Sequence, residues 1–248
     1  LRRMALEHVT MHIPAGSFAA LVGPSGGGKS TAGQLLARFW DVESGSISIG
    51  GKDIRDYSTK ALMNTVAFVF QDTYIFAESV YDNIAMHQNV TQEAVEYAAK
   101  AARCHVFIQG LPKGYDTKLG DGGHKLSGGE AQRIAIARAI LKNTPIVVLD
   151  EAMAFTDAEN ELALREGMAE LLKGKTVLMI AHHLYSIQDA DMIFVLENGR
   201  LKESGTHKDL IQKHGLYAHL WDIQNETENW RMKGGAAYVS DNPAIHLS

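Results

Sequence analysis

Cysteine and long hydrophobic runs are the features that this sequence most clearly lacks. Cys104 is the only cysteine among 248 residues, so no internal disulfide can form, and a single small thiol is typical of a chain kept in a reducing compartment such as the cytosol. No window of about eighteen residues is both apolar and uncharged, and the N-terminal residues do not follow the basic, apolar and small-residue order of a signal peptide. We therefore predict that these residues do not span a membrane themselves.

An excess of positive charge is also missing. The chain has 24 Lys and Arg residues against 29 Asp and Glu residues, which gives a formal net charge of -5. Binding to nucleic acid without regard to sequence depends on clustered Lys and Arg, whereas here the basic residues are scattered among acidic ones. We therefore expect no nucleic-acid partner. With 46% hydrophobic residues, the composition is that of a globular protein with one large domain or two small ones.

Short apolar runs that alternate with helical patterns indicate an α/β fold. The strand candidates are 17–22, 47–49, 66–70, 146–149, 176–180 and 192–196. The second run precedes Gly50 and Gly51, which indicates a strand that enters a turn. Helical patterns at Lys29–Trp40 and Ala158–Leu172 lie between the others. Because strands that alternate with helices form parallel sheets, we predict a mostly parallel sheet.

The longest helical stretch, 72–141, is predicted to be an insertion into this α/β pattern. Within it, Thr91 can cap a helix that has an acidic residue in its first turn and small apolar residues on one face, and that stops near Gly110. After Gln224 no clear periodicity remains. Residues 226–248 are therefore predicted to form an irregular tail, either mobile or wrapped on the surface.

A phosphate-loop pattern follows the first strand candidate. Its residues are Gly23, Pro24, Ser25, Gly26, Gly27, Gly28, Lys29 and Ser30, followed by Thr31. Glycines let backbone N–H groups converge on an anion, and the helix that starts near Lys29 adds its unpaired N–H groups and positive dipole end. Lys29 would neutralise the β- and γ-phosphates, and Ser30 would bind Mg²⁺. A flexible Gly-Ser turn is the alternative, but the strand before and the helix after favour a phosphate site.

Two carboxylates, Asp150 and Glu151, follow the apolar run that ends at Leu149. Asp150 is suited to hold Mg²⁺, and Glu151 is close enough to the γ-phosphate to orient or deprotonate the attacking water. Acidic residues at a strand end also cap the next helix, so the pair alone is weak evidence. Together with the phosphate loop, the pair predicts a nucleoside triphosphatase.

A third motif, Ser127, Gly128, Gly129 and Glu130, opens a helix that continues through Leu141. Ser127 and Glu130 have the spacing of a capping box, so a well-capped helix is the plainest interpretation. Two glycines at a helix N-terminus also expose N–H groups to an anion, which a cap does not need. The segment resembles the signature motif of ABC ATPases.

Six motifs in the family's order make the chain similar to the nucleotide-binding domain of an ABC transporter. They are the phosphate loop, Gln71, the signature, Asp150 with Glu151, Asp157 and His182. The resemblance covers nearly the whole chain and implies a P-loop NTPase core with a mostly parallel sheet, an antiparallel β part and an inserted α-helical subdomain. The implied domain spans 1–225, with 1–71 and 142–225 as the core and 72–141 as the helical subdomain.

The resemblance also implies ATP and Mg²⁺ as cofactors and a role for each motif. Gln71 would sense Mg²⁺ and link the site to the membrane domains, His182 would donate to the γ-phosphate, and Asp157 would belong to the D-loop beside the nucleotide. With Lys29 and Glu151, Gln71 and His182 would form the catalytic set. A strand-end hydrogen bond for Gln71 and a structural role for His182 are the alternatives.

In the family, the signature of one domain faces the γ-phosphate that a second domain holds. Ser127–Glu130 would therefore bind the nucleotide of a partner nucleotide-binding domain, in a homodimer or a heterodimer, and hydrolysis would let the two separate. The resemblance implies transmembrane domains as further partners and a location at the cytoplasmic face of the cell (inner) membrane. Residues 73–76 are candidates for docking a transmembrane coupling helix, with core packing as an equal alternative.

Details of the motifs narrow the resemblance. Residues 117–123, just before the signature, are similar to the X-loop of exporter-type domains. Glu130 stands where glutamine is usual, His183 stands where arginine is common, and residues 150–157 are similar to those of siderophore-handling transporters with exporter architecture. The family stacks adenine on an aromatic residue upstream of the phosphate loop, but no aromatic precedes Phe18. We therefore expect the chain to begin after that aromatic and after an edge strand.

Two other functions share parts of this pattern. A soluble ABC-type ATPase that acts as a mechanical clamp usually carries two such domains or a long coiled-coil insertion, and the sequence shows neither. A kinase or other phosphotransferase uses the same phosphate loop but has no need for the signature. The motor domain of an exporter-type transporter is the function that the sequence favours.

Overall fold

The computed structural model describes residues 5–70, 72–150 and 158–237. A six-stranded sheet forms its centre, in the order β4 (Val66–Val69), β5 (Ile146–Asp150), β6 (Thr176–Ile180), β1 (Phe18–Val22), β7 (Met192–Glu197) and β8 (Arg200–Gly205). The first five strands are parallel to their neighbours, and β8 pairs antiparallel with β7. The predicted α/β fold with a mostly parallel sheet is confirmed.

An antiparallel part lies beside this sheet. β2 (Ser48–Ile49) and β3 (Lys52–Asp53) form a two-stranded hairpin. Gly50 and Gly51 make its turn with φ angles of 58° and 79°, which glycine adopts without steric cost. This hairpin confirms the strand and turn that the sequence predicts at 47–51.

The central strand β1 shows why the sheet needs cover on both faces. Successive side chains of a strand point to opposite faces. Ala20 and Val22 accordingly belong to one hydrophobic cluster, and Ala19 and Leu21 belong to the other. All four are fully buried. Both faces of the sheet are therefore covered, as parallel sheets require.

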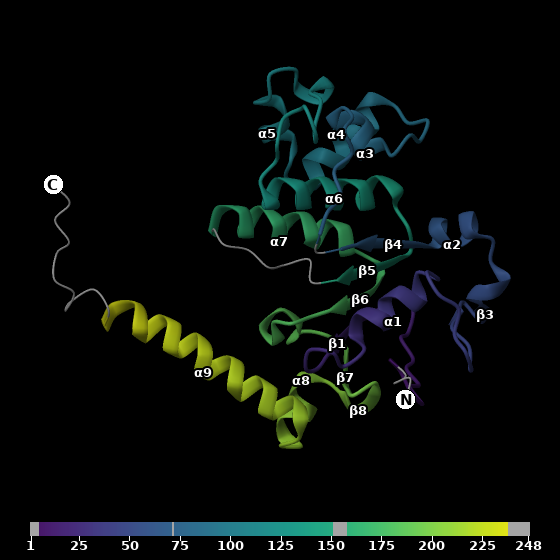
Figure 1. Cartoon of the computed structure of the whole chain (residues 1–248), viewed down its shortest axis with the longest axis vertical. Coiled ribbons are helices and arrows are strands. Elements are labelled where there is room, and N and C mark those ends of the chain that lie inside the picture. Colours follow the sequence, from purple (N-terminus) through teal and green to yellow (C-terminus); the bar gives the residue numbers. More distant parts are fainter. Residues whose placement is uncertain (1–4, 71, 151–157, 238–248) are drawn as a thin grey trace.

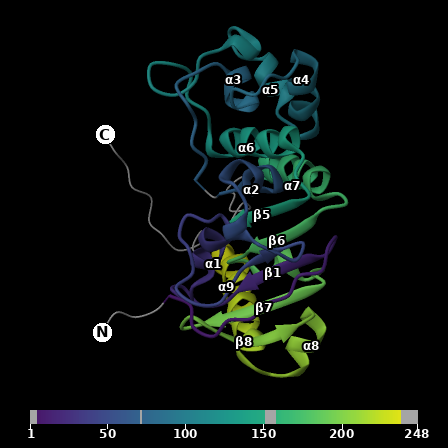
Figure 2. The same cartoon turned by 90° about the vertical axis from the view of Figure 1, so that its right-hand side faces the viewer.

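Different helices cover the two faces. On one face, α6 (Gly128–Lys142) and α7 (Ala158–Leu172) place Ile136 and Leu164 in the first cluster. On the other, α1 (Lys29–Leu36) and α2 (Thr59–Thr65) contribute Ala32 and Leu62 to the second. Figures 1 and 2 accordingly place α6 and α1 on either side of β5.

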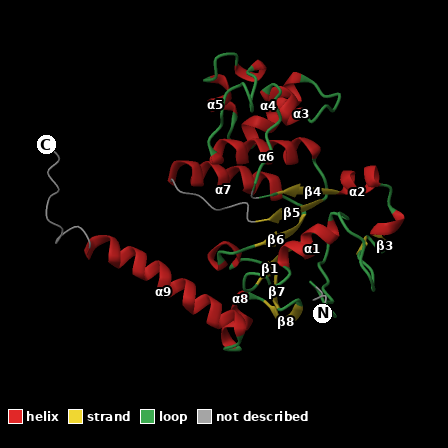
Figure 3. Cartoon of the chain, viewed as in Figure 1, coloured by secondary structure: helices red, strands yellow, loops and turns green. Residues whose placement is uncertain are grey.

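The predicted helical insertion forms one end of the molecule. It contains α3 (Val80–Ala85), α4 (Gln92–Ala101), α5 (His105–Gln109) and the 3₁₀ turn η2 (Gly114–Asp116), and Figure 3 shows this end built of helices and loops. The Thr91 hydroxyl accepts a hydrogen bond from the Ala94 amide, which confirms the predicted cap. The helix that it caps is shorter than predicted, because Arg103 adopts a left-handed φ of 57° and separates α4 from α5.

The predicted helix Lys29–Trp40 is too long. α1 ends at Leu36, and Arg38 adopts a left-handed φ of 56°. Its guanidinium donates to the carbonyls of Ile54 (3.2 Å) and Tyr57 (3.0 Å), at either end of the 3₁₀ turn η1 (Ile54–Asp56). These contacts draw the chain away from the helix axis, so the last four predicted residues lie outside the helix.

The prediction of an irregular tail after Gln224 is also wrong, as far as Ala237. Beyond α8 (His207–Gln212), the helix α9 (Leu216–Ala237) continues through this segment and extends away from the sheet in Figure 1. Glu, Arg, Met, Lys and Ala, which are common in 226–237, favour a helix through their intrinsic propensity. The absence of an apolar stripe therefore does not exclude a helix in this segment.

Candidate active site

The phosphate loop joins the end of β1 to the start of α1, as predicted. Gly23 and Gly28 have φ angles of 139° and 101°. A Cβ at Gly23 would lie 1.9 Å from the carbonyl oxygen of Leu196, and one at Gly28 would lie 2.6 Å from that of Ala5. Neither position can hold a side chain without moving backbone, so glycine is what lets the loop close against the sheet.

Lys29 lies inside this loop. The residue is 4% exposed, and its ammonium donates to the carbonyl oxygens of Gly23 (2.8 Å) and Pro24 (3.1 Å). Ser30 is exposed in the first turn of α1. A positive charge and a helix N-terminus thus lie on the same short loop, which is the arrangement that attracts phosphate.

A hairpin turn that the sequence analysis did not identify is hydrogen-bonded to the phosphate loop. Gly199, in the turn between β7 and β8, donates from its amide to the carbonyl of Gly27 (3.1 Å) and accepts from the amide of Glu7 (2.7 Å). The Arg200 guanidinium, 2.9 Å from the Glu7 carboxylate, lowers the pKa of Glu7. The Asn-Gly pair at this turn is a recognisable hairpin signal.

The predicted carboxylate and histidine lie at the same edge of the sheet as the phosphate loop. Asp150 ends β5 and pairs in register with Ile180 of β6, which pairs with Leu21 of β1. The carboxyl ends of these parallel strands therefore meet at one edge. His182 follows β6 there and is exposed. Gln71, Glu151 and Asp157 lie outside the described residues.

The signature residues form the predicted capping box. The Ser127 hydroxyl accepts from the Glu130 amide (3.3 Å), and the Glu130 carboxylate accepts from the Ser127 amide (2.8 Å). Ser127 and Gly128 are exposed. Apart from its chain neighbours and the backbone of its own helix, a Cβ at Gly128 would have no described atom within 4 Å. Packing against the described part of the chain therefore does not account for this glycine.

The segment after Gln71 is hydrogen-bonded to the signature helix by a partly buried arginine that the sequence analysis did not identify. Arg138 of α6 donates to the carbonyls of Asn83 (2.6 Å) and Tyr74 (2.8 Å) and to the Asn83 side-chain oxygen (2.8 Å). Burial lowers the pKa of Arg138 to about 10. The same Asn83 oxygen accepts from the Phe76 amide (2.9 Å). One arginine thus joins two segments that lie 55 or more positions apart in sequence.

The sequence left open whether residues 73–76 dock a partner or pack in the core, and the structure shows both exposed and core-packed side chains among them. Tyr74 is 71% exposed and packs edge-on against Phe76, whereas Ile75 packs against the core. Phe39 and Trp40, which follow α1, are also exposed, and Phe39 stacks on Phe70 with 6.3 Å between ring centroids. These exposed rings are the apolar surface that a partner could cover.

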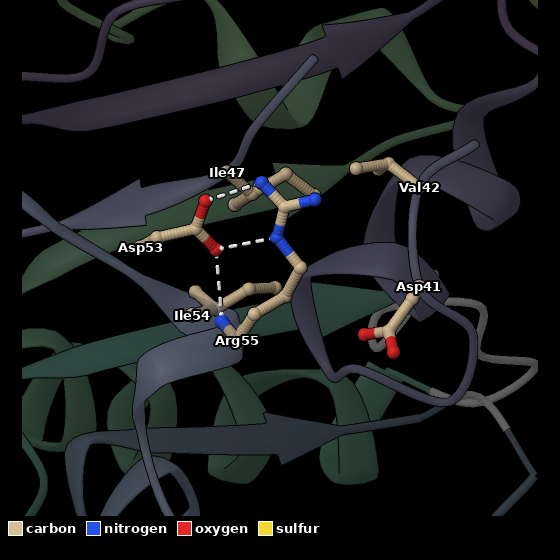
Figure 4. A pocket seen from close by; sticks show the side chains of 6 residues that line it. All are labelled: Asp41, Val42, Ile47, Asp53, Ile54 and Arg55. Carbon is tan, nitrogen blue, oxygen red and sulfur yellow. Dashed lines mark hydrogen bonds and ion pairs between the residues drawn. The ribbon is translucent and has the colours of Figure 1, made fainter. Parts of the chain in front are cut away.

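A small depression elsewhere contains none of the predicted site residues. Figure 4 shows that the Arg55 guanidinium turns towards the Asp53 carboxylate, with bonds of 3.0 and 2.6 Å. These bonds lower the pKa of Asp53 to about 2. The remaining lining residues are Asp41, Val42, Ile47 and Ile54. An ion pair within the chain fills this place, so we assign it no ligand.

Within the described ranges, no helix is both long and apolar enough to cross a bilayer.

The chain matches a known protein family and is similar to proteins of two bacteria. The family described as "ABC transporter" matches residues 6–154. The chain is 48% identical over 221 residues to the ATP-binding/permease protein YgaD of Bacillus subtilis, whose name suggests multidrug export, and 47% identical to a protein of similar name from Staphylococcus aureus. Each alignment covers 89% of this chain and 38% of the relative, so the chain spans well under half of their length.

A solved structure of a bacterial Atm1-family ABC exporter with ATP bound has the same fold. The TM-score is 0.83 at 43% sequence identity, over 89% of this chain and 39% of that one. The phosphate loop, the sheet edge and the capped signature helix are thus accompanied by close similarity in both sequence and structure. The chain belongs to the ABC transporter family.

Proposed function

We propose that this chain is the ATP-hydrolysing motor domain of an ABC transporter with exporter architecture. The observation that carries the proposal is the phosphate loop, in which the buried Lys29 ammonium lies among glycines whose Cβ atoms would not fit. The loop shares a sheet edge with Asp150 and His182. The names of the exporter relatives, each of them an ATP-binding/permease protein, support the same assignment.

The residues at this edge fit a magnesium nucleotide. Ser30 is exposed in the first turn of α1, and Asp150 ends a neighbouring strand. Hydroxyl and carboxylate oxygens are the ligands that Mg²⁺ prefers, and we propose both residues and Gln71 as its protein ligands. When bound, Mg²⁺ neutralises charge on the phosphates. Lys29 and the backbone N–H groups of the loop from Gly23 to Thr31, Pro24 excepted, bind the phosphate oxygens.

Two further residues act on the attacking water and the terminal phosphate. Glu151, next to Asp150, orients the water and accepts its proton. His182 donates a hydrogen bond to the terminal phosphate from the end of β6. Both roles rest on position along the chain and on the family resemblance.

The signature acts on the nucleotide of a second domain, of identical or different sequence. Ser127 and Gly128 present an exposed, glycine-rich helix N-terminus that packing against the described residues does not explain. A phosphate held by a partner would accept hydrogen bonds from it. Glu130 and Asp157 belong to the same interface.

Transmembrane domains are the other proposed partner. Tyr74, Phe39 and Trp40 expose aromatic surface close in sequence to Gln71 or to α1, and a coupling segment of a membrane domain would cover it. We accordingly propose a location at the cytoplasmic face of the membrane. The division into a core (1–71 and 142–225) and a helical subdomain (72–141) stays part of this proposal. Similarity to siderophore-handling transporters stays a prediction.

ATP-dependent dimerisation of Glu151→Gln tests the function. Removing the carboxylate slows hydrolysis, so we expect a stable dimer with ATP and Mg²⁺ by size-exclusion chromatography with light scattering, and a monomer without nucleotide. Lys29→Ala in the same background is the matched control and is expected to stay monomeric. An ATP-bound monomer would instead favour a phosphotransferase. The clamp alternative also predicts dimers, but ATP-binding/permease relatives favour transport.

A further inference from the structure

The long C-terminal helix α9 is anchored at its start to the edge strand of the sheet. The Glu203 carboxylate of β8 accepts hydrogen bonds from the amides of Leu216 (2.7 Å) and Tyr217 (3.1 Å). These amides lie in the first turn of α9, where an anion is favoured. A Cβ at Gly215 would lie 1.9 Å from that carboxylate, so any side chain there would displace the Glu203 side chain from these amides. The direction of α9 is thus set by the sheet itself.

From this anchor, α9 passes the segment that follows β6. The Gln224 side chain accepts from the Leu184 amide (2.8 Å) and donates to the His182 carbonyl (2.5 Å). One side-chain amide thus bridges the backbone on both sides of His183. These partners lie 40 or more positions away in sequence.

Neighbouring contacts hold the same segment against α9. The Tyr185 hydroxyl donates to the side-chain oxygen of Asn225, and the Tyr185 ring packs against Trp221 with 4.7 Å between ring centroids. Trp221 also packs against His207 of α8 at 4.6 Å. The 3₁₀ helix η3 (Leu184–Ile187) is therefore pinned on α9, and Leu184 itself is buried.

A bridge of this kind restricts the backbone from His182 to Leu184. The carbonyl of His182 belongs to the peptide group between residues 182 and 183, and the amide of Leu184 belongs to the one between residues 183 and 184. Holding both therefore fixes the orientation of these two peptide groups. His182 is exposed at the end of β6, and the direction of its backbone sets the region that its imidazole can reach. We infer that Gln224 is a positioning residue that holds His182 in its active orientation through the backbone of residues 182–184. The inference rests on the proposed ATPase function of His182.

ATPase kinetics of the full chain test this inference. Gln224→Glu has nearly the same shape and keeps the acceptor for Leu184, but it puts a carboxylate against the His182 carbonyl. We expect Gln224→Ala and Gln224→Glu to lower kcat by about threefold to tenfold, the size of one lost hydrogen bond. KM for ATP stays nearly unchanged, because Lys29 and the phosphate loop are untouched. Glu226→Gln, an exposed neighbour on the same helix, is the matched control and keeps wild-type kinetics.

A double-mutant cycle separates positioning from simple support of the fold. If Gln224 acts through His182, then Gln224→Ala causes no further fall in kcat once His182 is alanine. Additive losses, or wild-type kinetics in both Gln224 variants while His182→Ala is impaired, would overturn the inference and leave the proposed function standing. A wild-type rate in His182→Ala would remove the proposed role of His182 and the inference with it, and no ATP hydrolysis by the unsubstituted chain would remove the proposed function as well.

Discussion

The side-chain nitrogen of Lys29 lies 2.8 Å from the carbonyl oxygen of Gly23, six residues earlier in the same loop. Burial of an ammonium group is costly unless its protons find acceptors, and here two loop carbonyls serve. The contact keeps the charge at the centre of the loop, where a phosphate would need it. The charge that the proposed phosphate site requires is therefore held within the loop by the loop's own carbonyls.

Replacing Lys29 by alanine tests the role of this charge. Loss of charge-assisted hydrogen bonds worth about 1.5 to 3 kcal/mol weakens ATP binding by about tenfold to a hundredfold. Isothermal titration calorimetry with ATP measures the change. Lys60→Ala removes an exposed lysine elsewhere and should keep wild-type affinity. Equal affinity in both variants would contradict the role of Lys29.

Gly23→Ala tests the steric fit of the loop against β7. Its Cβ would lie 1.9 Å from the Leu196 carbonyl at a φ of 139°, so we expect the free energy of unfolding to fall by at least about 3 kcal/mol. Gly174→Ala is the control, because its φ is 70° but no described atom lies within 4 Å. It should lose only about 1 to 2 kcal/mol. Urea unfolding gives both values, and equal losses would show that the contact is unimportant.

Arg138→Met tests the link between the signature helix and residues 74–83. The substitution leaves the acceptors of Asn83 and Tyr74 without their donor, so we expect a loss of about 2 to 4 kcal/mol of unfolding free energy. Arg138→Lys keeps the charge but lacks the fork of donors, so its free energy of unfolding should lie between those of the unsubstituted chain and Arg138→Met. Thermal unfolding compares them. A Lys variant no better than Met would mean that charge contributes nothing here.

Glu130→Gln tests whether the signature glutamate contacts nucleotide. Glutamine keeps an oxygen that can accept from the Ser127 amide, so stability should change by less than about 0.5 kcal/mol. Removal of a negative charge near the proposed phosphate should alter the ATPase rate. Glu170→Gln, on an exposed site of α7, controls for net charge. Unchanged steady-state kinetics in Glu130→Gln would argue against a nucleotide contact.

Cys104 provides a test of pH dependence. Burial raises the pKa of its thiol from 9.0 to about 12, so the native thiol stays protonated at pH 8 and should react with iodoacetamide only after unfolding in urea. Because the folded-state pKa is the higher one, the stability that this thiol contributes is fully present below about pH 9 and is lost as the pH rises towards 12. Rapid alkylation of the native chain at pH 8 would contradict its burial.

Predictions from the sequence succeeded where neighbouring residues act together. The glycines before Lys29, the Thr91 cap and the Ser127–Glu130 capping box each depend on a few consecutive residues, and the structure shows all three. Asp150 and His182 lie at one edge of the sheet because their strands are parallel, as predicted, and the carboxyl ends of parallel strands meet. Helix ends are harder to predict, because the end of α1 depends on the hydrogen bonds that Arg38 donates to the carbonyls of Ile54 and Tyr57.

By itself, the sequence determined the phosphate loop, the capped signature helix, the mostly parallel sheet and the family, because short-range chemistry and strand–helix alternation encode them. Only the tertiary structure decided that Arg138 reaches Asn83, that Glu203 anchors α9, and that Gln224 bridges His182 and Leu184. These partners meet because packing of the sheet and helices brings distant segments together, and a side chain's donors and acceptors do not specify which distant backbone groups they will find.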